Sequence, residues 1–245
     1  MAIGGGGFTH ESHPELDRFC LEQTPRSAPR IGFVGAADND EPTKIERFYK
    51  RFKHCSTDLD HLPMETSGDG VARWLSNRDL VYFGGGNTVE MVAHFERQGW
   101  SIPLKQAACN GVTMAGVSAG AVFWFDWCLS DSTGNGLEPL RGLGLLTGGI
   151  CPHYSSQPER QSVLHKAVAS GAIPFSYAID DGAAVAFGTQ TIIGLCTAES
   201  TAGCYQISAN FSPGIYTGFA TTSQQVPLRC NERHYGSKCF ALGLF

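Results

Sequence analysis

Short apolar runs alternate along this chain with stretches in which apolar residues recur at helical spacing. That alternation is typical of βαβ units, in which helices connect parallel strands. The runs that predict strands in the first half are Met1–Ile3, Ile31–Val34, Leu80–Phe83 and Val112–Gly116. The stretches that predict helices are Glu15–Gln23, Pro42–Phe52, Val89–Gln98 and Ala119–Trp127. We therefore predict an α/β fold with a mainly parallel central sheet.

The pattern changes beyond Gly148 to short β runs that follow one another closely. These runs are Tyr177–Ile179, Ala183–Phe187, Thr191–Gly194 and Cys204–Ile207. They predict added strands and a hairpin-like edge. Because no repeat, linker or low-complexity tract divides the chain, we predict a single domain over residues 1–245, in which the part from about residue 212 is poorly patterned.

Composition favours a globular protein with a sizeable core. The chain has 245 residues, of which 42% are hydrophobic and 17% charged. The net charge of −5 and the scattered Lys and Arg residues argue against a nucleic-acid-binding surface. No apolar stretch approaches the about 20 residues that span a bilayer, and the N-terminal MAIGGGG is unlike a secretory signal. We expect a cytoplasmic protein that binds neither nucleic acid nor membrane; a homodimer is left open.

The nine cysteines do not predict a metal site. None of them forms a C-x-x-C pair, and paired ligands at short spacing are the usual mark of a zinc site. In a cytosolic chain most cysteines are small buried hydrophobic residues. The stretch His10–His13 (HESH) is better interpreted as a solvated loop than as a pair of metal ligands.

Two glycine runs follow predicted strands, at Gly4–Gly7 and Gly84–Gly86. The first does not satisfy G-x-G-x-x-G, because Thr9 occupies the last position, and neither run continues into the Gly-Lys-Ser/Thr of a P-loop. Each run is either a tight strand-to-helix turn or a place where bare backbone N–H groups face a ligand. Ligands of parallel α/β sheets bind at the carboxyl ends of the strands, so we expect both runs to lie at one edge of the sheet.

The segment Gly116–Gly120 (GVSAG) matches G-x-S-x-G between a predicted strand and a predicted helix. In that context a sharp turn exposes the serine, here Ser118, and the N–H of the next residue, Ala119, can donate to an oxyanion. The alternative is a serine that merely caps the helix of an ordinary turn.

A nucleophilic serine needs a base and an acid that orients the base. Of the eight histidines, His153 is the best placed, because it follows a glycine-rich apolar approach and a proline. Asp131 is the preferred acid, because the polar turn Ser130–Ser132 can reach back toward the serine. The other acids kept open are Glu138, Asp180 and Asp181. The histidine follows the serine too closely for an α/β-hydrolase, whose triad histidine comes late in the chain.

Five motifs in order along the chain resemble the peptidase E and cyanophycinase family of serine peptidases. They are YFGGGNT (82–88), AGVSAGA (115–121), SDS (130–132), PHY (152–154) and DDGAAV (180–185). The resemblance implies a three-layer α/β sandwich with a mainly parallel central sheet, similar to class I glutamine amidotransferases. Serine stands where those enzymes carry cysteine.

Carried over residue by residue, the resemblance implies a triad of Ser118, His153 and Asp131. It also implies Gly86 and Ala119 as oxyanion-hole donors, Asn87 as a pocket residue and Arg160 as the ligand of a substrate carboxylate. The expected activity is hydrolysis of short peptides, above all dipeptides with N-terminal aspartate, without metal or organic cofactor. The alternatives are a serine esterase or amidase on the same fold and a catalytically inactive protein that binds a ligand.

Overall fold

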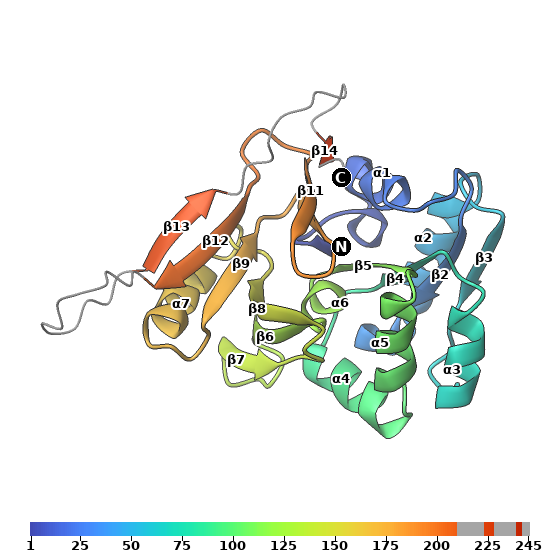
Figure 1. Cartoon of the computed structure of the whole chain (residues 1–245), viewed down its shortest axis with the longest axis horizontal. Helices are drawn as coiled ribbons and strands as arrows, with labels where there is room; N and C mark the ends of the chain where they lie inside the picture. The colour runs from blue at the N-terminus through green and yellow to red at the C-terminus, as the bar shows by residue number, and fades with distance from the viewer. Residues whose placement is uncertain (210–222, 228–238, 242–245) are drawn as a thin grey trace, which may run out of the picture.

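The larger of two β-sheets runs from the middle to the right of the view in Figure 1, and the smaller sheet lies on the left. The computed structural model describes residues 1–209, 223–227 and 239–241. Within them the strand order of the larger sheet is β14-β11-β10-β1-β5-β4-β2-β3. The strands from β1 to β3 in that order are parallel, and β10, β11 and β14 are antiparallel additions. Their bounds are β1 Ala2–Ile3, β2 Arg30–Val34, β3 Asp58–His61, β4 Leu80–Phe83, β5 Thr113–Val117, β10 Ala183–Phe187, β11 Ile192–Thr197 and β14 Cys239–Ala241. The predicted α/β class with a mainly parallel central sheet is confirmed.

A second sheet lies beside the first, with strand order β13-β12-β9-β8-β6-β7 (Figure 1). Strands β6, β8 and β9 run parallel, whereas β7, β12 and β13 are antiparallel to their neighbours. The bounds are β6 Phe125–Ser130, β7 Glu138–Arg141, β8 Leu146–Cys151, β9 Phe175–Ile179, β12 Cys204–Ala209 and β13 Ser223–Pro227. Of these strands the sequence pattern anticipated β9 and β12; it did not predict β6, β7, β8 or β13, nor that they form a sheet of their own, and the other two predicted runs joined the larger sheet as β10 and β11.

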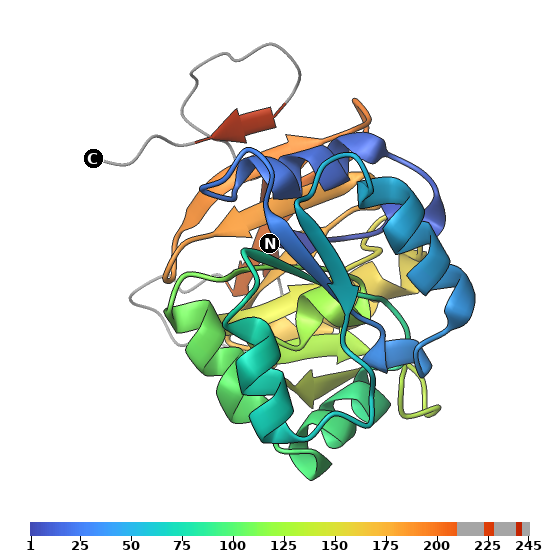
Figure 2. The ribbon, with the colours of Figure 1, turned by 90° about the vertical axis from the view of Figure 1, so that its right-hand side faces the viewer.

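Helices cover both faces of the larger sheet, as Figure 2 shows with the blue helices on one side and the green ones on the other. The helices of the described residues are α1 Pro14–Glu22, α2 Pro42–Phe52, α3 Gly68–Leu75, α4 Thr88–Arg97, α5 Ser101–Cys109, α6 Ala119–Val122 and α7 Pro158–Ala169, with 3₁₀ turns η1 Phe8–His10 and η2 Ala36–Asp38. Successive strand residues point to opposite faces. Tyr82 accordingly packs with α1 and α2, and Val81 and Phe83 pack with α3, α4 and α5. Helix α7 packs on the smaller sheet.

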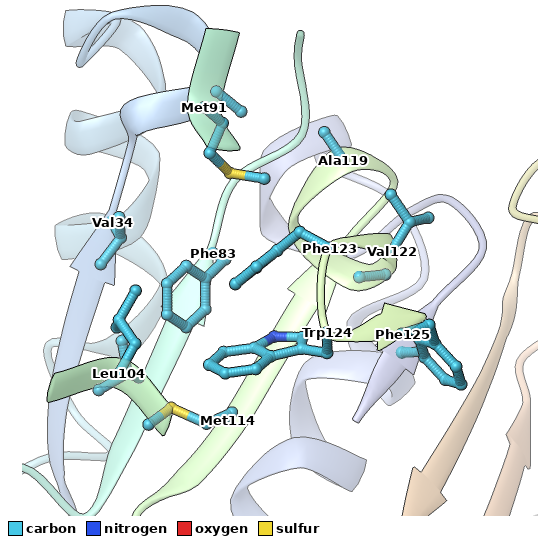
Figure 3. Close-up of a cluster of buried hydrophobic side chains, with 14 of the residues drawn as sticks. Val34, Phe83, Met91, Leu104, Met114, Ala119, Val122, Phe123, Trp124 and Phe125 are labelled. Atoms are coloured by element: carbon cyan, nitrogen blue, oxygen red, sulfur yellow. The ribbon is translucent and has the colours of Figure 1, made fainter. Parts of the chain in front are cut away.

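The predicted helix Ala119–Trp127 is wrong in its second half. Helix α6 ends at Val122, and β6 begins at Phe125. The Phe123 and Trp124 rings pack on Phe83, with ring centroids 5.0 and 5.3 Å away, in the buried cluster of Figure 3. The carbonyls of Phe123 and Trp124 accept hydrogen bonds from the backbone after β7 instead of continuing the helix. An apolar run of this length is compatible with either element, and its neighbours in space decided between them.

Some of the sequence predictions fall on the end of the chain. Of the poorly patterned part from about residue 212, only β13 and β14 lie within the described residues. Within the described ranges, no helix is both long and apolar enough to traverse a bilayer. The same residues contain no cluster of three or more His, Cys, Asp or Glu side chains that could hold a metal ion.

Candidate active site

Ser118 occupies the sharp turn between β5 and α6, with φ 53° and ψ −119°. Positive φ is rare outside glycine and marks a strained backbone. The flanking glycines have no room for side chains, since a Cβ on Gly116 would stand 2.0 Å from the Gly120 carbonyl oxygen, and a Cβ on Gly120 would stand 2.3 Å from the Phe83 carbonyl oxygen. The G-x-S-x-G spacing is therefore a steric requirement of this turn, which presents the serine at the carboxyl end of the sheet.

His153 faces Ser118 from the second sheet. It follows β8 by two residues, and its Nε2 lies 2.9 Å from the Ser118 Oγ. The loop is held by hydrogen bonds from the Tyr154 N–H to Ile179 and from the Gln157 N–H to the His153 carbonyl. The His153 side chain is 15% exposed. The serine and histidine that the sequence predicted to work together are thus in contact, each on a different sheet.

The acid beside His153 is Asp181. Its Oδ1 lies 2.6 Å from the His153 Nδ1, the ring nitrogen that does not face Ser118. Asp181 stands in the link between β9 of the smaller sheet and β10 of the larger sheet. The Gly182 N–H donates to the Gly5 carbonyl at 2.9 Å, which ties this link to the first glycine run. Because β1 lies next to both β10 and β5, the tie brings Asp181 to the same edge as Ser118.

The prediction that Asp131 contacts His153 is wrong. Asp131 lies in the turn after β6, is 64% exposed, and has its Oδ1 3.7 Å from the Arg160 Nη2. That turn packs on the start of α4, where the Ser132 hydroxyl accepts a hydrogen bond from the Thr88 N–H at 3.0 Å. The contact holds the turn away from the histidine.

The other two acids left open by the sequence also have different partners. Asp180 is 4% exposed and accepts hydrogen bonds from the Gly203 N–H at 2.9 Å and the Tyr205 hydroxyl at 3.3 Å. Glu138 accepts a hydrogen bond from the Thr133 hydroxyl. Among the acids considered, Asp181 is therefore the one that contacts the histidine.

The electrostatics of the pair favour an ionised Asp181. The hydrogen bond from His153 holds the pKa of the Asp181 carboxyl below its ordinary value, although partial burial acts in the opposite direction. Gly5 makes this contact sterically possible, since a Cβ there would stand 2.0 Å from the Asp181 Oδ1 and 3.0 Å from the His153 Nδ1. The first glycine run thus provides space for the His153–Asp181 pair. The sequence showed only that this run is not a dinucleotide-binding motif, and it did not indicate this role.

The second glycine run lies directly beside the serine. A Cβ on Gly85 would be 3.2 Å from the Ser118 Cβ. Gly86 is exposed and has φ 154°. It packs closely against the Ala37 carbonyl, since a Cβ on Gly86 would lie 2.1 Å from the carbonyl oxygen. None of the hydrogen bonds among the described residues uses the N–H of Gly86 or of Ala119. Both groups are therefore available to an external acceptor, as the predicted oxyanion hole requires.

Asn87 and Arg160 have partners within the protein. The Asn87 side chain caps α4 by accepting a hydrogen bond from the Glu90 N–H at 3.0 Å. Arg160, 6% exposed in its side chain, donates to the Leu129 carbonyl at 3.2 Å and to the Gln157 side chain at 2.5 Å. The predicted role of Arg160 as a ligand for a substrate carboxylate stays a prediction.

His10, on η1, was interpreted from the sequence only as part of a solvated loop. Its Nδ1 lies 2.9 Å from the Thr9 Oγ1 and 3.2 Å from the Gly6 carbonyl oxygen. Partial burial of the ring lowers the pKa of His10, although the hydrogen bond to the Gly6 carbonyl acts in the opposite direction.

Comparison with known sequences places the chain in a family and shows a related curated protein. The sequence profile of Peptidase family S51 matches residues 1–194. The Bacillus subtilis (strain 168) protein named "Uncharacterized peptidase YgaJ" is 34% identical over 209 residues, which are 84% of this chain and 90% of that protein.

Comparison with solved structures gives the fold. A Listeria monocytogenes EGD-e protein described as a peptidase E protein superposes with a TM-score of 0.58 at 18% identity, covering 78% of this chain and 95% of its own. A peptidase from an acI-B1 Actinobacterium superposes with a TM-score of 0.64 at 12% identity, covering 98% of this chain and 95% of its own. At such identities the likeness establishes the shared architecture.

Proposed function

Because the chain belongs to peptidase family S51, we propose that it is a serine peptidase with Ser118 as nucleophile, His153 as general base and Asp181 as the acid that orients His153. One observation carries this proposal: Ser118 Oγ, the His153 ring and the Asp181 carboxylate form a continuous chain of contacts of 2.9 and 2.6 Å. The arrangement meets the geometric requirement for a nucleophile activated by an oriented base.

The reaction follows from these positions. His153 Nε2 accepts the hydroxyl proton as Ser118 Oγ attacks the scissile carbonyl, and Asp181 stabilises the resulting imidazolium through Nδ1–H. The N–H groups of Gly86 and Ala119 hold the oxyanion, and one such donor is worth about 3–4 kcal/mol of barrier. His153 then returns the proton to the leaving amine, and water hydrolyses the acyl-enzyme by the same steps in reverse.

The proposed substrates are short peptides, with dipeptides that begin with aspartate as the first class to test. The five-motif resemblance to peptidase E supports this choice. The direct experiment compares Asp-Leu, Asn-Leu and Ala-Leu with a panel of acyl esters, using the wild type and Ser118→Ala. Cleavage of esters but of no peptide would contradict a peptidase and indicate an esterase. Absence of both turnover and Ser118 labelling by a fluorophosphonate would indicate an inactive ligand-binding protein.

The hydrolysis rate is expected to fall as the pH is lowered from about 8 to 5, because a general base must be unprotonated to accept the serine proton. A protonated His153 cannot accept the serine proton. Asp181 is not the cause of the loss, because its lowered pKa keeps the carboxylate charged throughout this range. The measurement is kcat/KM against pH for the best dipeptide, and a flat profile would contradict the role of His153 as base.

Arg160→Ala is expected to lower turnover of Asp-Leu and Ala-Leu by similar factors, together with a lower Tm. The reason is that the guanidinium is buried and holds the Leu129 carbonyl and the Gln157 side chain. The ratio of the two kcat/KM values, measured for wild type and variant, is the readout. If instead the variant loses only the activity on Asp-Leu, through a higher KM, Arg160 binds the substrate carboxylate as the sequence predicted.

A further inference from the structure

Lys44 lies beside the Gly84–Asn87 loop and has no part in the serine–histidine–aspartate chain. It stands near the start of α2, and its Nζ donates to the Gly85 carbonyl at 3.0 Å. The ammonium group also pairs with the Asp38 carboxylate at the end of η2. The side chains are only 26% and 14% exposed, respectively. A charged group is thus placed against the backbone of the loop that adjoins Ser118.

This loop is held at several points, whereas the N–H groups of Gly85 and Gly86 have no acceptor among the described residues. The Gly84 N–H donates to the Val34 carbonyl at 3.0 Å, and the Asn87 N–H donates to the Ala37 carbonyl at 2.6 Å. The Gly85 carbonyl accepts from Lys44. Among the described residues, the N–H of Gly86 has no acceptor. The contacts around the loop therefore fix its path and leave the Gly86 N–H for an external acceptor.

The Gly85 carbonyl and the Gly86 N–H belong to the same trans peptide unit, so they point in opposite directions. We propose that Lys44 is a positioning residue for the oxyanion hole, which orients and polarises the Gly85–Gly86 peptide from its carbonyl side. This inference rests on the proposed function, because it assumes that the Gly86 N–H holds an oxyanion.

Two physical effects support a lysine at this position. A hydrogen bond from an ionised donor is about twice as strong as one between neutral groups, so it resists rotation of the peptide plane. Charge drawn toward the carbonyl oxygen also makes the N–H of the same amide a better donor, as in other hydrogen-bond chains. Gly86 itself cannot resist rotation through a side chain; it lies against the Ala37 carbonyl, and Gly85 lies against Ser118 and Val117. Lys44 adds a charged hydrogen bond on the Gly85 carbonyl itself.

Asp38 has a separate part in this arrangement. Its carboxylate pairs with Lys44, so the ammonium group already has an anionic partner before any substrate arrives. A cation intended for a substrate carboxylate would gain less from binding when it is neutralised in this way. The pairing thus favours a positioning role for Lys44 over recognition of an acidic substrate.

The test uses Lys44→Met, which removes the charge and the donor but keeps the length of the side chain. We expect kcat on the best dipeptide to fall by about 10- to 100-fold. The loss should not exceed about 100-fold, because complete removal of an oxyanion-hole donor lowers kcat by about 100- to 1000-fold. KM should change little, because the ground-state carbonyl is not the group being stabilised. Affinity for a peptide aldehyde, which forms a tetrahedral adduct with Ser118, should fall by the same factor as kcat.

Three further variants complete the test. Lys44→Arg retains a charged donor and should recover most of the lost kcat. Asp38→Asn leaves Lys44 in place but removes its anionic partner. It should therefore lower kcat by a smaller factor than Lys44→Met does. This variant also tests the proposal if Lys44→Met folds poorly. The matched control is Lys50→Met on the same helix, where the side chain is 73% exposed and 3.9 Å from Glu11; it should behave as the wild type.

The outcomes separate this inference from the function on which it rests. A wild type that hydrolyses no peptide would overturn both. An active wild type, together with an unchanged kcat in Lys44→Met, would overturn only the role of Lys44. A rise in KM confined to peptides with N-terminal aspartate, at constant kcat, would show that Lys44 binds the substrate carboxylate and would also overturn the positioning role.

Discussion

Ser118→Ala is expected to abolish peptide hydrolysis, lowering kcat by about 10⁴- to 10⁶-fold, while the protein remains folded. The substitution removes one oxygen atom from a position whose backbone strain, at φ 53°, is the same for alanine as for serine. The measurement is single-substrate kinetics on the best dipeptide, with thermal unfolding as the check on folding. A variant that keeps more than a small fraction of the wild-type rate would show that another group is the nucleophile.

His153→Ala serves as the control for this prediction. Members of a triad act as a unit, so its loss should nearly equal that of Ser118→Ala, and the double variant should be little worse than either single variant. The 2.9 Å contact between the His153 Nε2 and the Ser118 Oγ is the structural reason. If the two losses instead add in free energy, His153 is not the base that activates Ser118.

Asp181→Asn is expected to lower kcat by about 10²- to 10⁴-fold, with a smaller effect on KM. An amide in place of the carboxylate can present N–H₂ to the His153 Nδ1, which favours the wrong tautomer and no longer stabilises the imidazolium. Asp181 is 40% exposed, so some solvent screening reduces its effect relative to a fully buried acid. The readout is kcat on the best dipeptide for wild type and variant.

Asp131→Asn is the matched control, because it makes the same chemical change at the acid that the sequence favoured. With an exposed side chain and a 3.7 Å contact to Arg160, Asp131 should tolerate the change with less than about a threefold loss of kcat. A large loss of kcat for Asp131→Asn, together with a small loss for Asp181→Asn, would show that Asp131 orients His153. The loop that carries Asp131 would then have to adopt a different position in the active enzyme.

The sequence identified those residues of the candidate site that come shortly after a strand. Ser118 comes after β5, Gly86 after β4 and His153 after β8, so each lies at a carboxyl end of a strand. The resemblance to peptidase E, drawn from five short motifs, is confirmed by the match to Peptidase family S51. The proposed roles of these residues remain to be tested by the variants above.

Secondary structure was predicted well where the pattern was regular and poorly where context decides. Helix α2 is found at Pro42–Phe52 as predicted, because a helix-compatible proline and a regular apolar face are local signals. Helices α3 and α5 and strands β3, β6, β7, β8, β13 and β14 were not predicted. Helix α5, for example, has a buried face that consists of little more than Leu104 and Ala107, so its apolar pattern is weak.

The sequence by itself determined the strained turn at Ser118 and the glycines around it. The requirement at Gly116 is steric and local, because a Cβ there would collide with the Gly120 carbonyl of the same turn; the one at Gly120 also depends on the neighbouring strand β4, whose Phe83 carbonyl a Cβ would meet. The α/β class was determined for a similar reason, since burial on both faces of a parallel sheet produces continuous apolar runs. Such features depend on neighbouring residues, and they are therefore readable along the chain.

Only the tertiary structure decided which acid contacts His153 and which cation donates a hydrogen bond to the Gly85 carbonyl. Asp131 is near Ser118 in sequence, yet the turn after β6 is held on α4. Asp181 is remote in sequence but is brought in by the pairing of Gly182 with Gly5. Lys44 reaches the Gly85 carbonyl because α2 packs beside the loop after β4. The physical reason is the same in each case: these contacts depend on the order of strands in two sheets, and no local preference of the chain encodes that order.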